Sequence, residues 1–504
     1  MPFTIIVETQ GLRKFIRKNF QKFGYLKLVI IDNLSQISNK NFFSIIIGSG
    51  PAGLTLALEL EKKKINSVLI EAGSNEYNAK ELRFMEGNLI GNSYNSHTAI
   101  SAGRLRQFGG TSGHWGGACN LFDKNDFKEW PIKKTDLEPY ILKAKKILNL
   151  KHKFFKENLS ENFNIYNLVF SKVRFGDKYF NHVKKSKFIY LSLNTVFINF
   201  NGNNGYIESI TCYKKRYINL KANYYILNCG GIENPRLLLW SQFKKPELFN
   251  HRLPIGNFFM DHPYHRVGEA VIIRDKFFSY FKNNNIVNTP IFSCSKSMYL
   301  SMNPNFLKQK KILNSGIYIN FSDIKINDDF LNQLRCAAPK YFRKLTDKKK
   351  INDINHISID LVQEEPALYE NKIVLGKNLD PLNIPLVEMY ASKSEKLKNS
   401  AAEIMNEFAN FLLNNDIGRA AIKEYVFNKN DYEIHAVGGH HIGTTRIGES
   451  VKDSVVDKNL KVHGFKNLFI GGSSIFRTGG HCHPTHTIVQ FALRLSDHLS
   501  KLVI

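Results

Sequence analysis

Two stretches rich in histidine suggest a site where imidazole groups do chemistry. TGGHCHPTHTI spans Thr478–Ile488, and HAVGGHHIGTT lies upstream of it. Imidazole and thiolate groups bind zinc, and an imidazole also exchanges protons near neutral pH. The two stretches therefore allow either a metal site or a proton-handling centre, built from His435, His440, His441, His481, Cys482, His483 and His486.

The spacing of these residues favours the proton-handling centre. His481, Cys482 and His483 are consecutive, so in an extended segment their side chains alternate between two faces. Pro484 follows; it can begin a helix but cannot lie inside one. At most two of the four downstream side chains can converge without the upstream stretch, and no acidic or cysteine partner completes a ligand set. We therefore predict no metal site.

A glycine-rich turn near the start of the chain predicts a dinucleotide site. Phe43–Gly48 is a short apolar run typical of a buried parallel strand, and GSGPAG follows it. A helical pattern and a second strand, which ends at Glu71, complete the unit. Gly48 permits the tight turn, Gly50 admits the pyrophosphate and Gly53 packs helix on strand. The pyrophosphate would lie at the helix N-terminus, and Glu71 would accept from ribose hydroxyls.

Three later segments distinguish FAD from NAD, which the glycine motif alone does not. GRLRQFGGTSGHWGGACNLF (Gly103–Phe122) is a glycine-dense loop, and Tyr224–Leu239 is a strand, a Gly-Gly turn and a helix. Leu460–Leu499 is again strand, loop and helix. Together with GSGPAG, these segments resemble the glucose–methanol–choline (GMC) family of flavin oxidoreductases, most strongly the branch with pyranose oxidase and bacterial sugar or alcohol dehydrogenases. The resemblance covers most of residues 41–265 and 435–504.

The resemblance implies an α/β fold with an α+β substrate part. A Rossmann-like FAD-binding domain would combine with a discontinuous substrate domain, built on a half-exposed antiparallel sheet with helices. In His356–Val362 the apolar residues alternate with Ser358 and Asp360, as in a strand. Asn371–Gly376 (NKIVLG) and Pro385–Ala391 (PLVEMYA) are also expected to be strands of this sheet, and Leu397–Leu412 carries an apolar helical stripe. We expect an N-terminal extension (1–40), three FAD-binding parts (41–127, 190–265, 435–504), a substrate or cap part (128–189) and a substrate-binding domain (266–434).

The family pattern assigns two catalytic histidines. One lies three residues before the glycine of a Gly-Thr pair, which matches His440, and the second lies directly before Pro-Thr, which matches His483. By this resemblance His440 is the base that takes the hydroxyl proton while hydride passes to flavin N5, and His483 holds the substrate oxygen; an overlap or exchange of the two roles stays open. Pyranose-oxidase-like members usually carry Asn at the second position, so the His–His pair leaves the substrate subclass open.

The same resemblance implies a set of FAD contacts. His114 stands before Trp115 at the position where pyranose oxidase carries the flavin covalently, and other members with the same pair bind FAD without a bond, so both forms stay open. The helix that begins near Pro484 would aim its positive end at the flavin. We expect Asp261 and His262 beside the pyrophosphate or the substrate entrance. The expected cofactor residues are Gly48, Gly50, Pro51, Ala52, Gly53, Glu71, Ala72, Gly109, Gly110, Thr111, His114, Trp115, Asn120, Val196, Gly230, Ser473, His483, Pro484 and Thr485.

The predicted function is an FAD-dependent oxidoreductase acting on the CH–OH group of a sugar, sugar derivative or other alcohol. The electron acceptor is open between dioxygen, a quinone and a carrier protein. Two alternatives remain: a lyase of the same fold that keeps FAD as a structural group, and a basic protein that binds nucleic acid or a membrane surface.

Composition weighs against the last alternative. The chain carries 70 Lys and Arg against 44 Asp and Glu, but these charges are spread along the 504 residues without a basic block interleaved with aromatics. We therefore expect no nucleic-acid partner. No apolar run reaches the length of a membrane span, so we expect no integral membrane segment. The N-terminus lacks signal-peptide order and the six cysteines show no CxxC, which favours a cytoplasmic location.

Overall fold

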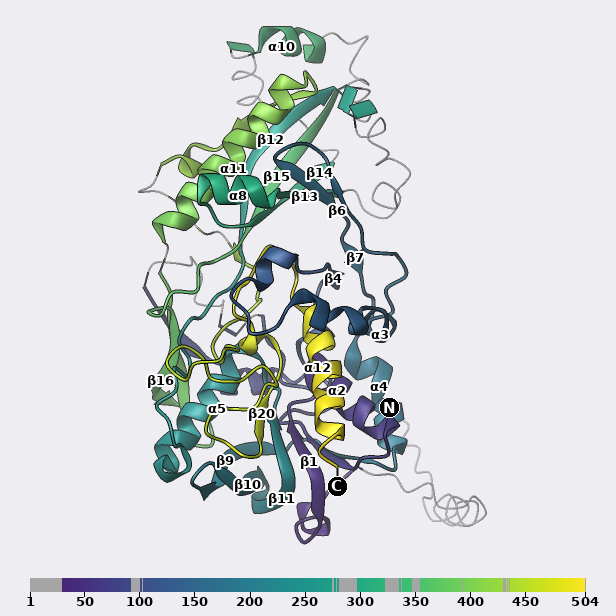
Figure 1. Ribbon diagram of the computed structural model, residues 1–504, viewed down its shortest axis with the longest axis vertical. Helices are drawn as coiled ribbons and strands as arrows, with labels where there is room; N and C mark the ends of the chain where they lie inside the picture. Colours follow the sequence, from purple (N-terminus) through teal and green to yellow (C-terminus); the bar gives the residue numbers. More distant parts are fainter. Residues whose placement is uncertain are drawn as a thin grey trace, which may run out of the picture.

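The structure is a computed structural model, and its larger sheets lie in two halves of an elongated molecule (Figure 1). It describes residues 30–91, 100–101, 103–273, 276–277, 279–280, 297–321, 335–336, 338–346, 354–392, 394–428, 432, 434 and 436–503. One half contains a sheet with a parallel core, and the other contains an antiparallel sheet. Each half has its own cluster of buried apolar side chains.

The first sheet is built around five parallel strands in the order β8-β2-β1-β11-β20. Their bounds are β1 Asn41–Ile47, β2 Ser67–Ile70, β8 Ile189–Ser192, β11 Arg216–Leu227 and β20 Leu468–Ile470. The first half of β11 continues into an antiparallel meander with β10 (Tyr206–Lys214) and β9 (Val196–Asn203). Because the five core strands run in one direction, their carboxyl ends meet at one edge of the sheet.

Three helices begin at or beyond that edge. They are α2 (Pro51–Lys62) after β1, α5 (Gly230–Lys244) after β11 and α12 (Thr485–Ser500), which follows β20 after a loop. Helix α12 packs against α2 (Figure 1). Pro51 occupies the first turn of α2, where its missing N–H costs no helical hydrogen bond. This arrangement confirms the predicted Rossmann-like unit, and it directs three helix N-termini toward one region.

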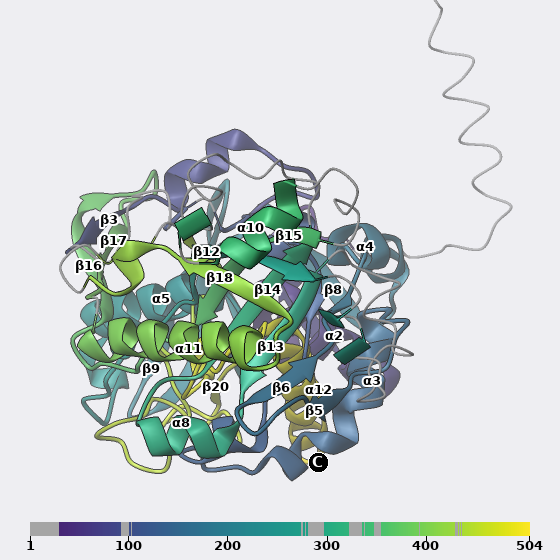
Figure 2. The same cartoon turned by 90° about the horizontal axis from the view of Figure 1, so that it is seen from above.

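The second sheet is antiparallel throughout, in the order β18-β12-β15-β14-β13-β6-β5, with β19 also paired to β12. Helix α11 (Glu395–Asn414) crosses over it (Figure 2). The predicted stripe of α11 is confirmed, because Leu397, Ala401, Ile404, Phe408 and Leu412 are all buried. The strands are β5 Lys156–Asn158, β6 Phe163–Tyr166, β12 Pro263–Ile273, β13 Ser297–Met302, β14 Ser315–Phe321, β15 Ile354–Gln363, β18 Gly418–Ile422 and β19 Ala436–Val437.

The expectation of a half-exposed sheet is wrong for β15. Ile359 and its alternate neighbours face the apolar core, as predicted, but Ser358 and Asp360 are also buried. Asp360 accepts hydrogen bonds from Tyr264 and Asn320 and forms an ion pair with Arg266, so its negative charge is compensated although the side chain is buried. Strand β15 is therefore buried on both faces.

Two segments assigned to the substrate sheet form a separate sheet instead. β16 (Lys372–Leu379) pairs with β17 (Pro385–Tyr390), and β17 pairs in parallel with β3 (Gly87–Ile90). Alternating apolar residues predict a strand but not its partner. The remaining strands and α-helices of the described residues are the pair β4 (Ala118–Cys119) and β7 (Val169–Phe170) and the helices α3 (Ile141–Ile147), α4 (Phe175–Lys185), α8 (Pro304–Lys310) and α10 (Pro339–Thr346).

The predicted N-terminal extension is only partly described. Its residues 1–29 lie outside the described residues. Ile31, Leu34 and Ile37 are buried in the core of the first half, and Ile30 forms a parallel bridge with Leu191 of β8. Residues 31–40 therefore pack as part of the nucleotide half, because their apolar side chains cover the edge next to β8. The other domain boundaries stay predictions.

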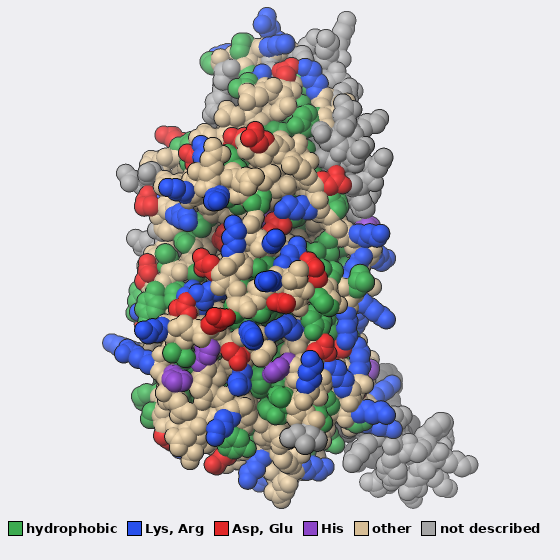
Figure 3. Space-filling model, viewed as in Figure 1, with side chains coloured by type: hydrophobic (Ala, Val, Ile, Leu, Met, Phe, Trp, Pro, Cys, Tyr) green, Lys and Arg blue, Asp and Glu red, His purple; other side chains and the backbone are tan. Residues whose placement is uncertain are grey.

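The visible face in Figure 3 shows Lys and Arg side chains dispersed among Asp and Glu. The five cysteines within the described ranges are all free. Within the same ranges, no helix has both the length and the apolar character required to cross a bilayer.

Candidate active site

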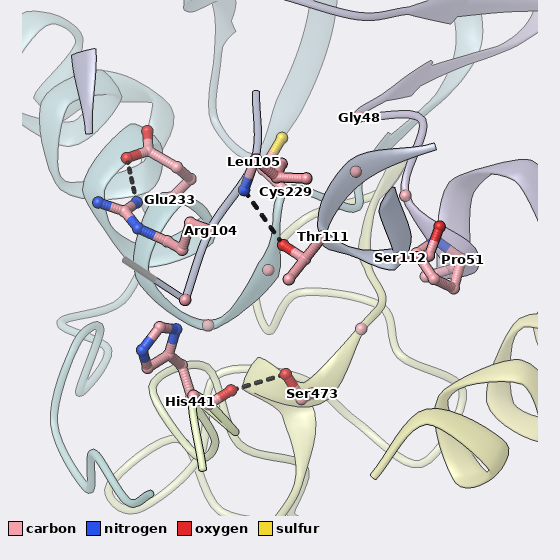
Figure 4. Close-up of a pocket in the computed structure, with 18 of the residues that line it drawn as sticks. Gly48, Pro51, Arg104, Leu105, Thr111, Ser112, Cys229, Glu233, His441 and Ser473 are labelled. Atoms are coloured by element: carbon pink, nitrogen blue, oxygen red, sulfur yellow. Dashed lines mark hydrogen bonds and ion pairs between the residues drawn. The ribbon is translucent and has the colours of Figure 1, made fainter. Parts of the chain in front are cut away.

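A cavity of about 600 Å³ lies where the three helix N-termini meet. Its wall reaches from the glycine-rich turn after β1 to β12 and β14 of the antiparallel sheet, through Tyr264 and Tyr318. Figure 4 shows three separate parts of the chain around it: the β1–α2 turn with Gly48 and Pro51, the loop with Thr111 and Ser112, and the C-terminal region with His441 and Ser473.

The glycine-rich turn has the geometry that the sequence predicts. Gly48 has a positive φ of 98°, and a Cβ there would lie 2.6 Å from the carbonyl oxygen of Asn228. A Cβ on Gly53 would lie 1.9 Å from the carbonyl oxygen of Gly48, so this glycine is needed where α2 packs close to β1. A Cβ on Gly50, by contrast, would meet nothing within 4 Å, and Gly50 lines the cavity. The turn thus has free space where a pyrophosphate would lie.

Glu71 lies at the end of β2 and lines the cavity, as predicted. Its carboxylate accepts hydrogen bonds from Ser49 N and Oγ at 3.1 and 2.6 Å and from Gly73 N at 2.9 Å. Burial raises the pKa of Glu71, and these hydrogen bonds and the charge of Arg106 oppose that shift. The contact of Glu71 with ribose hydroxyls stays a prediction, whereas its hydrogen bonds to Ser49 of the glycine-rich turn are present in the structure.

The glycine-dense loop contributes one wall of the cavity. Gly110, Thr111, His114 and Trp115 line it, and His114 is exposed. Gly109 does not line the cavity, although we expected it to; a Cβ there would lie 2.2 Å from the backbone nitrogen of Gly176. This glycine is therefore required by the close approach of the loop to α4.

The remaining expected cofactor residues come from the strand ends and helix starts. Asn120 is buried behind the wall rather than in it, and its Oδ1 accepts from the backbone nitrogen of His483 at 2.8 Å. Ser473 Oγ lines the cavity and donates to the carbonyl oxygen of His441 at 2.6 Å. The predicted residues that line the cavity are Gly48, Gly50, Pro51, Ala52, Glu71, Ala72, Gly110, Thr111, His114, Trp115, Val196, Gly230, Ser473, His483, Pro484 and Thr485.

The two predicted catalytic histidines lie side by side in the cavity wall. The ring centroids of His440 and His483 are 5.1 Å apart, and the rings are nearly perpendicular. Tyr318 OH lies 3.4 Å from Nε2 of His483, while Nδ1 of His483 is buried without a hydrogen-bond partner among the described residues. The two histidines that we expected to transfer a proton therefore line the same cavity as the glycine-rich turn.

Burial sets the protonation of this pair. Burial lowers the pKa of His440 well below its ordinary value, and the neighbouring His262, His483 and His441 lower it further. Burial likewise lowers the pKa of His483 to about 3. Both rings are therefore neutral at pH 7, which leaves each with one nitrogen lone pair that can accept a proton or a hydrogen bond.

A third histidine takes a part in the site that sequence reasoning did not foresee. Nδ1 of His262 lies 2.7 Å from Nδ1 of His440, and His262 also lines the cavity. We expected Asp261 and His262 only near the pyrophosphate or the substrate entrance. The Asp-His pair directly before Pro263, where β12 begins, is the sequence signal that marks this position.

A buried ionic network forms another part of the wall and was not predicted. Arg236 pairs with Asp380 at 2.7 Å and with Glu233 at 3.0 Å, and Arg104 pairs with Glu233 at 2.9 Å. Figure 4 shows the pairing of Arg104 with Glu233 beside the cavity. The chain offers these arginines without a recognisable motif, so only the folded arrangement shows that they meet.

The other residues of the histidine stretches have structural contacts. His481 is buried against Tyr299, and His486 bonds Gln490 at 3.1 Å. His441 packs on Phe259, and Cys482 Sγ contacts the carbonyl oxygen of Leu121 at 3.1 Å. His435 lies outside the described residues. Within the described ranges, no three His, Cys, Asp or Glu side chains are grouped so that they could hold a metal ion.

The residues present fit FAD by the open space they leave. Gly50 and Gly230 both line the cavity with no chain atom near the place of a Cβ, so a ligand can approach their backbones. Pro484 and Thr485 place the N-terminus of α12 at the same wall, where a helix end favours negative charge. A diphosphate at the first turn and an aromatic ring system near His440 are thus both accommodated.

Comparisons with known proteins agree with this geometry. Residues 332–492 match the profile of the family described as GMC oxidoreductase. Pyranose 2-oxidase of Tricholoma matsutake is 46% identical over 55 residues, which cover 11% of this chain and 10% of that protein. The fructose dehydrogenase large subunit of Gluconobacter japonicus is 24% identical over 290 residues, covering 55% and 47%. These alignments span less than half of either relative.

Solved structures match over nearly the whole chain. Formate oxidase superimposes with a TM-score of 0.55 at 15% identity, covering 92% of this chain and 99% of that one. Pyridoxine 4-oxidase from Mesorbium loti gives a TM-score of 0.54 at 14% identity, covering 91% and 99%. These matches establish the fold. The chain is therefore similar to the GMC oxidoreductases, which bind FAD, over residues 332–492, and it has the fold of these two solved oxidases.

Proposed function

We propose that this protein is an FAD-dependent oxidoreductase that oxidises the CH–OH group of a sugar, sugar derivative or other alcohol. The observation that carries the proposal is that two neutral imidazoles, His440 and His483, open into the same cavity as the glycine-rich nucleotide turn. A third relative, 2-methyl-1,2-propanediol dehydrogenase of Mycolicibacterium austroafricanum, is 39% identical over 64 residues, which cover 13% of this chain and 12% of that protein. Its name, like those of pyranose 2-oxidase and fructose dehydrogenase, also suggests a hydroxylated substrate.

The nucleotide end of the cavity would hold the diphosphate. Gly50 and the first turn of α2 present backbone N–H groups there, and Ser49 is already bound to Glu71. When bound, FAD supplies the acceptor for the hydride of the alcohol carbon. The residues of the chain then have to position the substrate and remove its hydroxyl proton.

His440 is assigned the role of base. Its low pKa keeps the ring neutral at pH 7, so it is ready to accept a proton. An alcohol O–H becomes strongly acidic only as the C–H electron pair leaves, because the oxygen then approaches the state of a protonated carbonyl. A weak base is sufficient at that moment. His483, beside it, would hold the substrate oxygen by a hydrogen bond and fix the geometry.

An anaerobic panel of alcohols and sugars tests this assignment on the purified yellow protein. We expect at least one compound to bleach the flavin absorbance, and His440→Ala to slow that bleaching by ~10²–10⁴-fold, the usual contribution of a positioned base. His182→Ala is the matched control, because that histidine is exposed on α4 and pairs with Glu61. Flavin that stays oxidised while a substrate is consumed would support the lyase alternative instead.

A further inference from the structure

The contact between His262 and His440 determines which nitrogen of His440 is free. Two imidazole nitrogens 2.7 Å apart form a hydrogen bond only when one carries a hydrogen and the other a lone pair. The structure alone does not place hydrogens, so the direction must come from the other partners of the two rings. His262 has such a partner on its opposite nitrogen.

The carbonyl oxygen of Gly479 fixes the hydrogen on His262. It lies 3.2 Å from Nε2 of His262, and a carbonyl oxygen can only accept. Nε2 of His262 therefore carries the hydrogen. Burial lowers the pKa of His262 to about 4, so the ring is neutral at pH 7 and holds only that one hydrogen. Its Nδ1 must then be the acceptor, and Nδ1 of His440 must be the donor.

We propose that His262 is a positioning residue that holds His440 in the tautomer with hydrogen on Nδ1, leaving Nε2 to accept the substrate proton. This inference rests on the proposed function for the role of the base, although the tautomer itself does not. Among the described residues, none other than His262 hydrogen-bonds a ring nitrogen of His440. The opposite tautomer would place two lone pairs against each other at the His262 contact.

The backbone around the two rings is built to keep them together. One carboxylate oxygen of Asp261 accepts from the backbone nitrogens of both His262, at 2.7 Å, and His440, at 2.8 Å. Met260 and Ile442 exchange backbone hydrogen bonds at 3.0 and 2.9 Å, and Gly438 N donates to the carbonyl oxygen of His262 at 2.8 Å. The two segments therefore form an antiparallel frame that fixes the separation of the imidazoles.

The same contact supports His440 after it has accepted the proton. The added proton would reside on Nε2, and the Nδ1–H would continue to donate to Nδ1 of His262. A hydrogen bond that gains a charged donor becomes stronger. Burial and the neighbouring His262, His483 and His441 all disfavour a positive charge on His440, and this strengthened hydrogen bond from the neutral His262 offsets part of that cost.

The tautomer can be measured directly by ¹⁵N spectroscopy of histidine-labelled holoprotein, with His440 assigned by its loss in His440→Gln. We expect a protonated Nδ1, an unprotonated Nε2 and a scalar coupling across the Nδ1–Nδ1 hydrogen bond. A protonated Nε2 on neutral His440 in the wild-type protein would overturn the proposal. This readout requires no turnover, so it remains decisive even if no alcohol reduces the flavin, an outcome that would count against the proposed function alone.

Two variants separate positioning from simple packing. His262→Asn places an amide oxygen near the position of Nδ1 and can still accept from His440, whereas His262→Leu cannot. We expect His262→Leu to lose the Nδ1–H tautomer and to slow flavin reduction by roughly 10- to 100-fold, with His262→Asn restoring the tautomer and most of the rate. Equal effects of the two variants on the rate, with the tautomer unchanged in both, would contradict the role. If His262→Leu does not fold, the wild-type and His262→Asn spectra decide the question.

Discussion

At the scale of single residues, some buried histidines of this protein line the cavity and others are packed away from it. His440 and His483 line the cavity and remain neutral beside the space for a substrate. His486, three residues beyond His483, lies under the first turns of α12, where it bonds Gln490 and packs edge-on against Phe154. A buried imidazole away from the cavity is held neutral only by packing, and its protonation should therefore affect stability.

We predict that His486 makes the protein less stable in acid. Burial lowers the pKa of His486 to about 4, below the ordinary value of an unfolded chain. Its contribution to the free energy of unfolding is therefore fully present above about pH 6.5. As the pH falls toward 4, the free energy of unfolding decreases by on the order of 3 kcal/mol. His486→Leu cannot titrate. It should be less stable than the wild type at pH 8, and the difference should shrink or reverse by pH 4.5.

Urea unfolding of the two proteins at pH 8, 6 and 4.5 measures this difference. Comparing the proteins at each pH cancels the titration of groups they share, including Asp261, whose pKa burial raises to about 7 with the opposite sign. A gap between the two unfolding midpoints that is the same at all three values of pH would refute the prediction.

At the scale of elements, the β1–α2 turn separates two uses of glycine. Gly53 makes room for the backbone of Gly48, while Gly50 faces open space at the cavity. The two positions lie three residues apart in one motif, and the structure gives them different neighbours. A methyl group at each should therefore fail in a different way.

We predict that Gly53→Ala mainly lowers stability and that Gly50→Ala mainly lowers FAD affinity. A Cβ at Gly53 would come within 1.9 Å of a backbone oxygen, so α2 must move away from β1. A Cβ at Gly50 meets no chain atom within 4 Å, so the fold can accept it, although a pyrophosphate cannot approach as closely. We expect a loss of roughly 10-fold or more in affinity, worth about 1.4 kcal/mol.

The two variants act as controls for each other. Thermal unfolding of the FAD-free proteins should show a lowered midpoint for Gly53→Ala and a nearly unchanged one for Gly50→Ala. Flavin fluorescence titration should show weak binding for Gly50→Ala. Unchanged affinity in that variant would mean that Gly50 does not face the cofactor.

At the scale of the whole molecule, a buried ionic network connects the nucleotide half to the β16–β17 hairpin. Arg236 of α5 reaches Asp380, which lies in the turn between the two strands, and also donates to the carbonyl oxygen of Pro385 at 2.7 Å. Arg104 joins the same network through Glu233 and donates to the carbonyl oxygen of Met85. Buried ion pairs thus connect α5 to the β16–β17 hairpin at this side of the cavity.

We predict that Arg236→Met destabilises the protein by about 3–5 kcal/mol, because it leaves the carboxylate of Asp380 buried without its partner. Lys245→Met is the matched control: it removes a cation just beyond α5 that pairs with Glu247 in solvent, where such pairs contribute at most about 1 kcal/mol. Calorimetric unfolding of both variants compares the two losses. Similar losses would show that the buried network carries no special stability.

Local patterns predicted much of the fold and half of the site. The apolar run of β1, the glycine turn and the stripe of α11 each encode an element and its buried face, and all three are found as expected. The histidine motif led to His440 and His483 in one cavity. Alternation along β16 and β17 predicted strands but assigned them to the wrong sheet, because a period of two does not identify a partner.

The sequence by itself therefore determined the nucleotide-binding unit, the pair of catalytic candidates and the start of α12, since each depends on residues close together in the chain. Only the tertiary structure decided that His262 contacts His440, a contact between positions 178 residues apart, and that Arg236 meets Asp380 across 144 residues. The physical reason is that side-chain periodicity records which face of an element avoids water. A buried polar pair depends on two distant segments being brought to hydrogen-bond distance, and that happens only when the sheets have paired.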